Sequence, residues 1–399
     1  MQTQVIVMQK RLILPTLAAI GLLSAFSLSS PASADPGVSA DKIVFGQAAP
    51  LEGPAAALGQ DMRTGILAAF EEANKAGGVG GRKLELISRD DGYEPNKAIE
   101  MTKKLLDEDK VFGLIGSVGT PTSSATQPIA TEQGAPFIAP FTGAEFLRNP
   151  FKANVINVRA SYFQETEAMV ERLTKDRNAS RIAMLYQDDA YGRAGLAGVQ
   201  KALEKRNMKL VAEGTYERNT VAVKGALLEI RKGNPEAVIM VGAYKPCAEF
   251  IKLARQLKME AQLINISFVG SNALAKDLGN AGGGVIITQV VPFPEDSSIP
   301  VVASYQAALK AHDANAKPGF VTLEGYIVGK LAIEGLKKVS GEPTRKAFLD
   351  AVLGNAFDLG GFKLSYSASD NQGSDEVFLT QIQPDGSFKS ITSLSQAGG

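Results

Sequence analysis

The chain has 399 residues, and its 42 lysines and arginines balance 42 aspartates and glutamates. This even balance argues against a nucleic-acid-binding protein, because such proteins carry an excess of basic side chains. The single histidine, His312, excludes metal sites that use several histidines, and the single cysteine, Cys247, excludes an internal disulfide. A chain of this length exceeds one ordinary core, so we expect two lobes that are stabilised by core size.

The N-terminus has the order of a secretory signal peptide. Lys10-Arg11 precede an apolar stretch at 12–28, and Ala32-Ser33-Ala34 supplies the small-x-small pattern of a cleavage site. The alternative is a membrane anchor, because the stretch approaches the about 20 residues needed to span a bilayer. Pro15 interrupts the stretch and favours the signal peptide, so we predict cleavage after Ala34. The mature chain is then slightly acidic, since the removed segment carries two basic residues and no acidic one.

Short β-rich runs alternate with helical patterns from the first strand onward, which is typical of βαβ units and parallel sheets. The first run predicts strands at 43–45, 84–87, 111–115 and 137–139, with helices over 60–73, 95–108 and around 129. The rhythm restarts after a break near Arg159. There the sequence predicts strands at 182–186, 209–213, 237–241 and 263–266, and helices at 194–205, 222–232 and 248–257. Two such runs indicate two doubly wound lobes.

The C-terminal part follows a different order. A strand at 285–290 leads into a loop that contains Pro292 and Pro294, and helices are expected at 301–312 and 323–338. The segments 362–364 and 377–382 are predicted to be closing strands.

Catalytic motifs are not evident. The sequence contains no G-x-S-x-G elbow and no Walker A pattern, and the glycines at 77–81 have neither the spacing nor the helix–strand order of a dinucleotide loop. The neighbouring carboxylates Asp90-Asp91 and Asp188-Asp189 point apart on extended backbone, so turn formation is the preferred interpretation. His312 is expected to be solvated at a helix end, and Cys247 to be a buried structural thiol. An enzyme is therefore not expected, although a secreted enzyme stays as a rival hypothesis.

One segment has the features of a binding device. The predicted third strand runs into a loop at 116–124, in which Thr120 is a candidate N-cap and Pro121 suits the first helical position. The hydroxyls of Thr122 and Ser123, with free backbone N–H groups, would point beyond the strand ends. Ligands of doubly wound sheets collect there, and helix N-termini favour carboxylates. The alternative is a helix that is merely well capped.

Several stretches, taken in order, resemble the leucine/isoleucine/valine-binding protein family, which are the type I periplasmic binding proteins of ABC importers. The similarity covers essentially the whole mature chain. The matching stretches are GQAAPLEGPAAALG at 46–59, Ala73–Val79 with Gly81, Asp90-Asp91 with Pro95, Ser124–Pro128, Pro136–Pro140, DDAYGRAG at 188–195, Gly242–Tyr244 and Val269–Ala273.

The resemblance implies an α/β fold of two doubly wound Rossmann-like lobes that are joined by three crossover segments. Mapped here, residues 1–34 are the signal peptide, 41–159 plus 292–361 form lobe 1, and 160–291 plus 362–399 form lobe 2. It further implies a periplasmic monomer without a cofactor that closes about a hinge on a small ligand. The partners it implies are ABC permease subunits, so that contact with the membrane is peripheral, and the rival interpretation is a sensory input protein for a separate receptor.

The resemblance also implies the ligand-binding residues. In lobe 1 they are Thr120, Thr122, Ser123, Phe141, Thr142 and Gly143, and in lobe 2 they are Tyr191 and Tyr244, with Ser267 and Phe268 at the place where amino-acid binders carry an acidic residue. A buried ammonium without a carboxylate partner costs several kcal/mol. The ligand is thus expected to be a branched-chain amino acid, if another carboxylate such as Glu52 reaches in, or a related small carboxylate with an apolar or aromatic body.

Overall fold

The computed structural model describes residues 1–6, 8 and 35–396. The predicted apolar stretch and cleavage site, at 12–34, lie outside the described residues, as do residues 397–399 of the predicted lobe 2. Within the part that is described, none of the helices combines the length and the hydropathy that crossing a bilayer requires.

The first lobe is built on a five-stranded parallel sheet with the strand order β2-β1-β3-β4-β5. Its strands are β1 (Lys42–Ala49), β2 (Lys83–Asp90), β3 (Leu114–Ile115), β4 (Phe137–Ile138) and β5 (Val155–Ile156). The connecting helices are α1 (Ala56–Lys75), α2 (Pro95–Lys103) with a π-helical turn at Lys104–Glu108, and α3 (Thr120–Glu132). Parallel strands need such crossover helices, which is why this lobe alternates strand and helix.

The second lobe is built on a seven-stranded sheet with the strand order β14-β13-β10-β9-β8-β6-β7. Its parallel strands are β6 (Ile182–Gln187), β7 (Ala212–Tyr216), β8 (Ala237–Val241), β9 (Gln262–Asn265) and β10 (Ile286–Gln289). The helices are α4 (Tyr162–Arg177), α5 (Ala190–Glu204), α6 (Lys224–Lys232), α7 (Tyr244–Gln256) and α8 (Ser271–Leu278). Two antiparallel strands, β13 (Phe378–Ile382) and β14 (Phe388–Ile391), close one edge.

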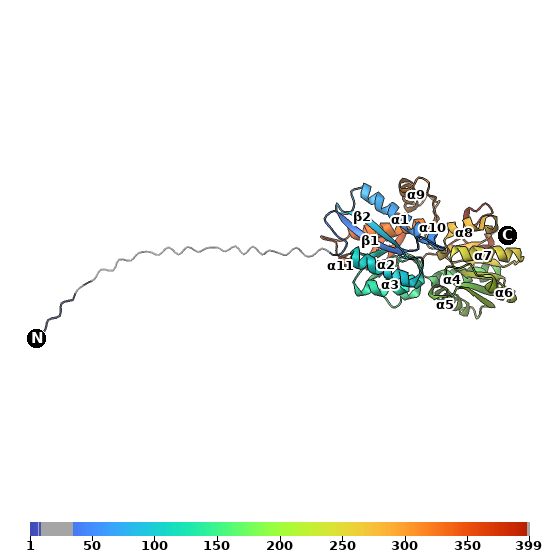
Figure 1. Cartoon of the computed structure of the whole chain (residues 1–399), viewed down its shortest axis with the longest axis horizontal. Helices are drawn as coiled ribbons and strands as arrows, with labels where there is room; N and C mark the ends of the chain where they lie inside the picture. The colour runs from blue at the N-terminus through green and yellow to red at the C-terminus, as the bar shows by residue number, and fades with distance from the viewer. Residues whose placement is uncertain (7, 9–34, 397–399) are drawn as a thin grey trace. The chain divides into compact units, whose positions relative to one another are not determined.

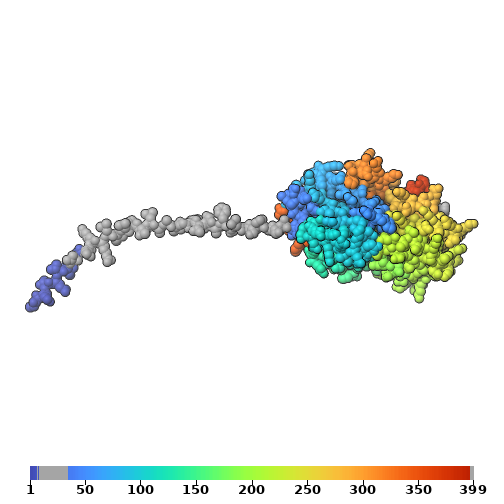
Figure 2. All heavy atoms as spheres, viewed as in Figure 1, coloured from blue at the N-terminus to red at the C-terminus, as the bar shows by residue number. Residues whose placement is uncertain are grey.

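The chain passes between the two sheets three times, at 157–161, 290–299 and 366–377. After the second passage α9 (Pro300–His312) and α10 (Phe320–Lys337) pack on α1, so this C-terminal segment joins the first lobe (Figure 1). In Figure 2 the orange atoms of this segment lie against the blue atoms of the first lobe. The first and third passages are hydrogen-bonded to each other, since the amide of Asn157 donates to the carbonyl of Asn371 over 2.8 Å. The predicted fold of two Rossmann-like lobes with three crossovers is confirmed.

Close contact between α1 and α10 depends on glycine. A Cβ atom on Gly65 would lie 2.0 Å from the carbonyl oxygen of Thr322, and one on Gly325 would lie 2.3 Å from the carbonyl oxygen of Met62. The two helix backbones therefore touch directly, which no larger residue at these positions permits.

The structure corrects several predicted elements. The segment 362–364 closes neither sheet, because β12 (Lys363–Ser365) pairs with β11 (Ala356–Asp358) in a separate two-stranded ribbon. Strand β7 begins three residues later than predicted, and β3 has two residues instead of five. Helix α4 was not predicted, although Ser161 and Gln164 form a capping box at its start, which is a recognisable sequence signal. Helices α8 and α11 (Arg345–Val352) and the short strand β5 were also missed.

Candidate ligand-binding site

The loop between β3 and α3 brings hydroxyl groups to the carboxyl end of the first sheet. Its backbone continues beside the segment after β4, with a bridge between Val118 and Phe141, so Thr120 comes to lie beside Thr142. The two hydroxyl oxygens are 2.7 Å apart and both side chains are buried. The N-cap of α3 is Gly119 and not Thr120 as predicted. The position requires glycine, because its backbone has φ 105° and a Cβ atom would lie 2.2 Å from the ring of Tyr93.

The other two predicted hydroxyls of this loop differ from each other. Thr122 donates to the carbonyls of Val118 and Gly119, so its hydroxyl is satisfied by its own turn. The Ser123 hydroxyl oxygen is buried and has no hydrogen-bond partner among the described residues. Of these two hydroxyls, only that of Ser123 is therefore available to another group.

Aromatic rings from both lobes meet around Phe268. Its ring centroid lies 4.5 Å from that of Tyr191, 5.2 Å from that of Phe141 and 6.0 Å from that of Tyr93. Tyr162 extends the cluster, with its centroid 5.6 Å from that of Tyr191. Tyr93 and Phe141 follow strands of the first sheet, while Phe268 and Tyr191 follow strands of the second. All five rings are buried, so the cluster forms an apolar contact between the lobes.

A carboxylate lies behind Ser267, on an element that the sequence did not reveal. Glu165 of α4 accepts hydrogen bonds from the Ser267 amide and hydroxyl, each 3.0 Å, and from the Thr288 hydroxyl at 2.5 Å. Burial raises the pKa of Glu165, against the opposing effect of Arg159 and these donors. Glu165 thus fixes the turn that presents Phe268, and both of its oxygens are engaged. The other candidate acid, Glu52, is exposed.

The first crossover carries a buried cation. Arg159 donates to both carboxylate oxygens of Glu324 in α10, over 2.8 and 2.9 Å, and its guanidinium carbon lies 4.4 Å from the centre of the Phe141 ring. Burial disfavours the charge of Arg159, and Glu324 more than offsets this, so the pKa of the guanidinium lies above its ordinary value. The Nη1 atom has no hydrogen-bond partner among the described residues.

The remaining predicted residues also lie at the junction of the lobes. The Tyr191 hydroxyl donates to the carbonyl of Gly242 at a long 3.5 Å, and the Tyr244 hydroxyl accepts the amide of Ala57, in the other lobe, at 3.4 Å. The backbone amide of Tyr162 donates to the carbonyl of Gly143 over 2.7 Å. The structure therefore brings the ten predicted residues to the two facing sides of one junction, together with Tyr93, Arg159, Tyr162 and Glu165, which sequence reasoning missed.

Polar contacts at the rim link the same two lobes. Arg218, between β7 and α6, pairs with Asp189 of its own lobe at 2.9 Å and with Glu94 of the first lobe at 2.8 Å. The Asn219 amide donates to Glu94 at 2.7 Å and to the carbonyl of Gly92 at 3.1 Å. Asp189 also accepts the amide of Tyr191 at the start of α5, as expected for a turn-forming acid. These contacts hold the two lobes together at the rim.

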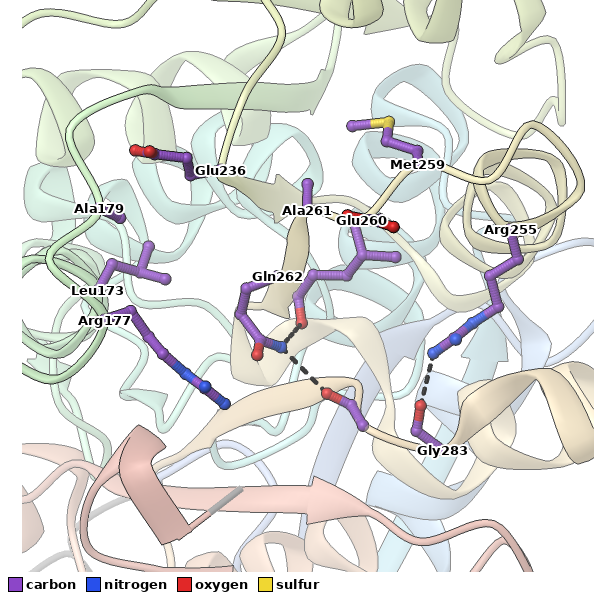
Figure 3. A pocket seen from close by; sticks show the side chains of 12 residues that line it. Leu173, Arg177, Ala179, Glu236, Arg255, Met259, Glu260, Ala261, Gln262 and Gly283 are labelled. Atoms are coloured by element: carbon purple, nitrogen blue, oxygen red, sulfur yellow. Dashed lines mark hydrogen bonds between the residues drawn. The ribbon is translucent and has the colours of Figure 1, made fainter. Parts of the chain in front are cut away.

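A pocket of about 430 Å³ lies at the opposite end of the second sheet (Figure 3). Its walls include Glu236 before β8, Gln262 at the start of β9 and Gly283 before β10, and the Arg255 guanidinium donates to the carbonyl of Gly283. These are the amino ends of the strands. Ligands of doubly wound sheets bind outside the carboxyl ends, so this pocket does not compete with the junction as the ligand site.

Other residues considered from the sequence have structural roles. Cys247 is fully buried, as predicted, and burial raises the pKa of its thiol. His312 ends α9 but is less solvated than expected, because its Nδ1 atom lies 2.8 Å from a carboxylate oxygen of Glu71. In the described part of the chain, no group of three or more His, Cys, Asp or Glu side chains is arranged to hold a metal ion.

Comparison with known proteins agrees with this architecture. Residues 42–387 match the model of a family described as periplasmic binding protein. A Leu/Ile/Val-binding protein homolog of Brucella abortus is 26% identical over 349 residues, which is 84% of each chain. A leucine-, isoleucine-, valine-, threonine-, and alanine-binding protein of Pseudomonas aeruginosa is 26% identical over 327 residues, covering 80% of this chain and 84% of the relative.

Among solved structures, a possible leucine/isoleucine/valine-binding protein from Rhodopirellula baltica superposes with a TM-score of 0.86 and 38% sequence identity, covering 90% of this chain and 98% of that one. The relatives are periplasmic solute-binding proteins and not enzymes. This chain therefore belongs to the periplasmic binding protein family, in its type I, leucine/isoleucine/valine-binding branch.

Proposed function

We propose that this protein is the periplasmic substrate-binding component of an ABC importer, and that it captures a small carboxylate with an apolar or aromatic body. Branched-chain amino acids belong to this class, as the names of the relatives suggest. The observation that carries the proposal is the position of Phe268, whose buried ring packs on Phe141 and Tyr93 of the other lobe beside the hydroxyls of Thr120 and Thr142. An apolar body fits against such rings, and a carboxylate fits beside the hydroxyls.

Charge supports an acid without an ammonium group over an amino acid. The Glu165 oxygens already accept three hydrogen bonds from Ser267 and Thr288, and Glu52 is exposed. Neither Glu165 nor Glu52 would thus be free to pair with a ligand ammonium, and a buried ammonium without a carboxylate partner costs several kcal/mol. We therefore rank aliphatic and aromatic acids above leucine within the proposed class.

The proposed mechanism is hinge closure. The open protein binds the ligand on one lobe, and the second lobe then completes the contacts, so that the ligand stabilises the closed state by its higher affinity for that state. In this proposal 41–159 with 292–361 moves against 160–291 with 362–399, the mature chain starts at Asp35 after cleavage, and the closed monomer docks on the permease.

A thermal-shift panel on the chain from Asp35 tests the ligand class. The panel holds L-leucine, L-valine, isovalerate, phenylacetate, benzoate and, as a neutral control, D-glucose. A ligand at about 1,000 times its dissociation constant adds about 4 kcal/mol of stability, which corresponds to a rise of several degrees in melting temperature.

Matched variants then test the site. Thr142→Val removes a hydroxyl from the junction and should weaken the best ligand at least about tenfold. Thr174→Val removes a hydroxyl that bonds only within α4 and should leave the affinity unchanged. Absence of binding by every acid and amino acid, both in the panel and among compounds released from the denatured protein, would refute the proposed function.

A further inference from the structure

The buried hydroxyl of Tyr162 lies close to the hydroxyls of Thr142 and Thr120 without a well-aligned hydrogen bond to them. Tyr162 is the first residue of α4, its side chain is fully buried, and its hydroxyl oxygen has no hydrogen-bond partner among the described residues. Buried tyrosine hydroxyls usually find a partner, and leaving such a group unsatisfied costs about 1–3 kcal/mol. An unsatisfied hydroxyl in a well-packed region therefore indicates a group that another molecule satisfies.

The Tyr162 ring is held firmly against the hydroxyl-bearing segment of the first lobe. Its backbone amide donates to the carbonyl of Gly143, and a Cβ atom on Gly143 would lie 2.6 Å from the ring. The hydroxyls of Thr142 and Thr120 are near enough to influence the phenol: burial raises the pKa of Tyr162 to about 12, and Arg159 and these two hydroxyls act in the opposite direction. Tyr162 thus completes a group of three hydroxyls.

Several buried donors at the junction have no hydrogen-bond partner. Thr120 and Thr142 use one of their two hydroxyl protons for each other, and Thr142 also accepts the amide of Ala144 at 3.2 Å. The hydroxyls of Tyr162 and Ser123 and the Nη1 group of Arg159 are buried donors that have no hydrogen-bond partner among the described residues. An ionised carboxylate is acceptor-only and has about four lone-pair sites, so it complements such a set.

We propose that Tyr162 is a ligand-binding residue whose hydroxyl donates a hydrogen bond to the ligand carboxylate beside Thr120 and Thr142. This inference rests on the proposed function and adds a residue that the ten predicted ones do not contain. It assigns the acidic end of the ligand to the Tyr162 side of the junction and its apolar body to the Phe268 side. Tyr162 and Phe268 together then select an acid by its charge at one end and its apolar surface at the other.

The test is Tyr162→Phe, which keeps the ring and removes only the hydroxyl. Its affinity for L-leucine, isovalerate and phenylacetate is measured by calorimetry, with phenylacetamide as the uncharged counterpart of phenylacetate. We expect about 10- to 100-fold weaker binding of the acids, as for a hydrogen bond to a charged group, and a ratio of acid to amide affinity that falls about tenfold. Tyr305→Phe is the matched control, because it removes a buried phenol hydroxyl that bonds to Thr322 in the first lobe.

The outcomes separate the two proposals. Binding of none of the acids by the wild-type protein contradicts the proposed function itself, and this inference falls with it. The role of Tyr162 alone is overturned if the wild type binds the acids, Tyr162→Phe binds them within about threefold of the wild-type affinity, and the ratio of acid to amide affinity is unchanged. If Tyr162→Phe fails to fold, the ratio of acid to amide affinity is measured on Thr142→Val instead. An unchanged ratio in that variant overturns the proposal that the ligand carboxylate lies beside these hydroxyls.

Discussion

Replacing Glu324 with glutamine should destabilise the protein by about 3–5 kcal/mol, because it leaves the Arg159 guanidinium buried without a carboxylate. The side chains of the pair are 2% and 4% exposed, and two hydrogen bonds of 2.8 and 2.9 Å join them. A replacement partner is not at hand, since the nearby Glu165 already accepts bonds from Ser267 and Thr288. Both side chains are buried away from bulk solvent, so the desolvation cost of the cation remains.

Urea unfolding, followed by circular dichroism, measures this effect. The matched control is Asp350→Asn, which breaks the exposed Lys346–Asp350 pair, 84% and 63% exposed, and should change the free energy of unfolding by less than about 0.5 kcal/mol. The double variant Arg159→Met with Glu324→Met should recover most of the loss, because apolar replacement of a whole buried pair is often neutral. A loss below about 1 kcal/mol in Glu324→Gln, or a double variant as unstable as the single one, would refute the reasoning.

Three further predictions follow from burial, packing and interlobe contacts. Burial raises the pKa of Asp91 to about 7, so the folded protein keeps a proton that the unfolded chain releases above about pH 4. The stability that this proton contributes is lost as pH rises toward about 7. Asp91→Asn should therefore melt higher than the wild type at about pH 8 and show a flatter dependence of melting temperature on pH, and identical pH profiles would contradict this. Gly65→Ala should lower the free energy of unfolding by about 1–3 kcal/mol, because the added Cβ would collide with α10. The control Gly225→Ala has open space around it in α6 and should raise the free energy of unfolding by up to about 1 kcal/mol. Shifts of the melting temperature with the same sign in both variants would contradict the packing argument. Glu94→Gln removes the rim ion pair with Arg218, which should favour the open state and weaken binding of the best ligand about two- to fivefold in calorimetry. An unchanged affinity would show that the rim contact does not favour closure.

Local sequence pattern was enough for most of the strands and helices and for much of the core. Helix α1 shows its buried face through Met62, Ile66 and Phe70 at four-residue steps, and β8 is a continuous apolar run, as expected for a strand covered on both faces. Cys247 was placed correctly in the core for the same reason, because it precedes an apolar helical face. Strands of two residues, such as β3 and β5, are too short to carry a periodicity, and their bounds were wrong or missing.

What the sequence determined by itself is the alternation of strands and helices in its two runs, and the loop at 116–124 as the place where hydroxyls collect, since each of these depends on neighbours a few residues away. The tertiary structure alone decided which groups meet. Glu165 and Ser267 are 102 positions apart, and Arg159 and Glu324 are 165 apart, so no local pattern connects them. The roles proposed for Phe268 and Tyr162 depend equally on how the two lobes pack, because a ring or a hydroxyl acquires its partners only when the opposite lobe supplies them.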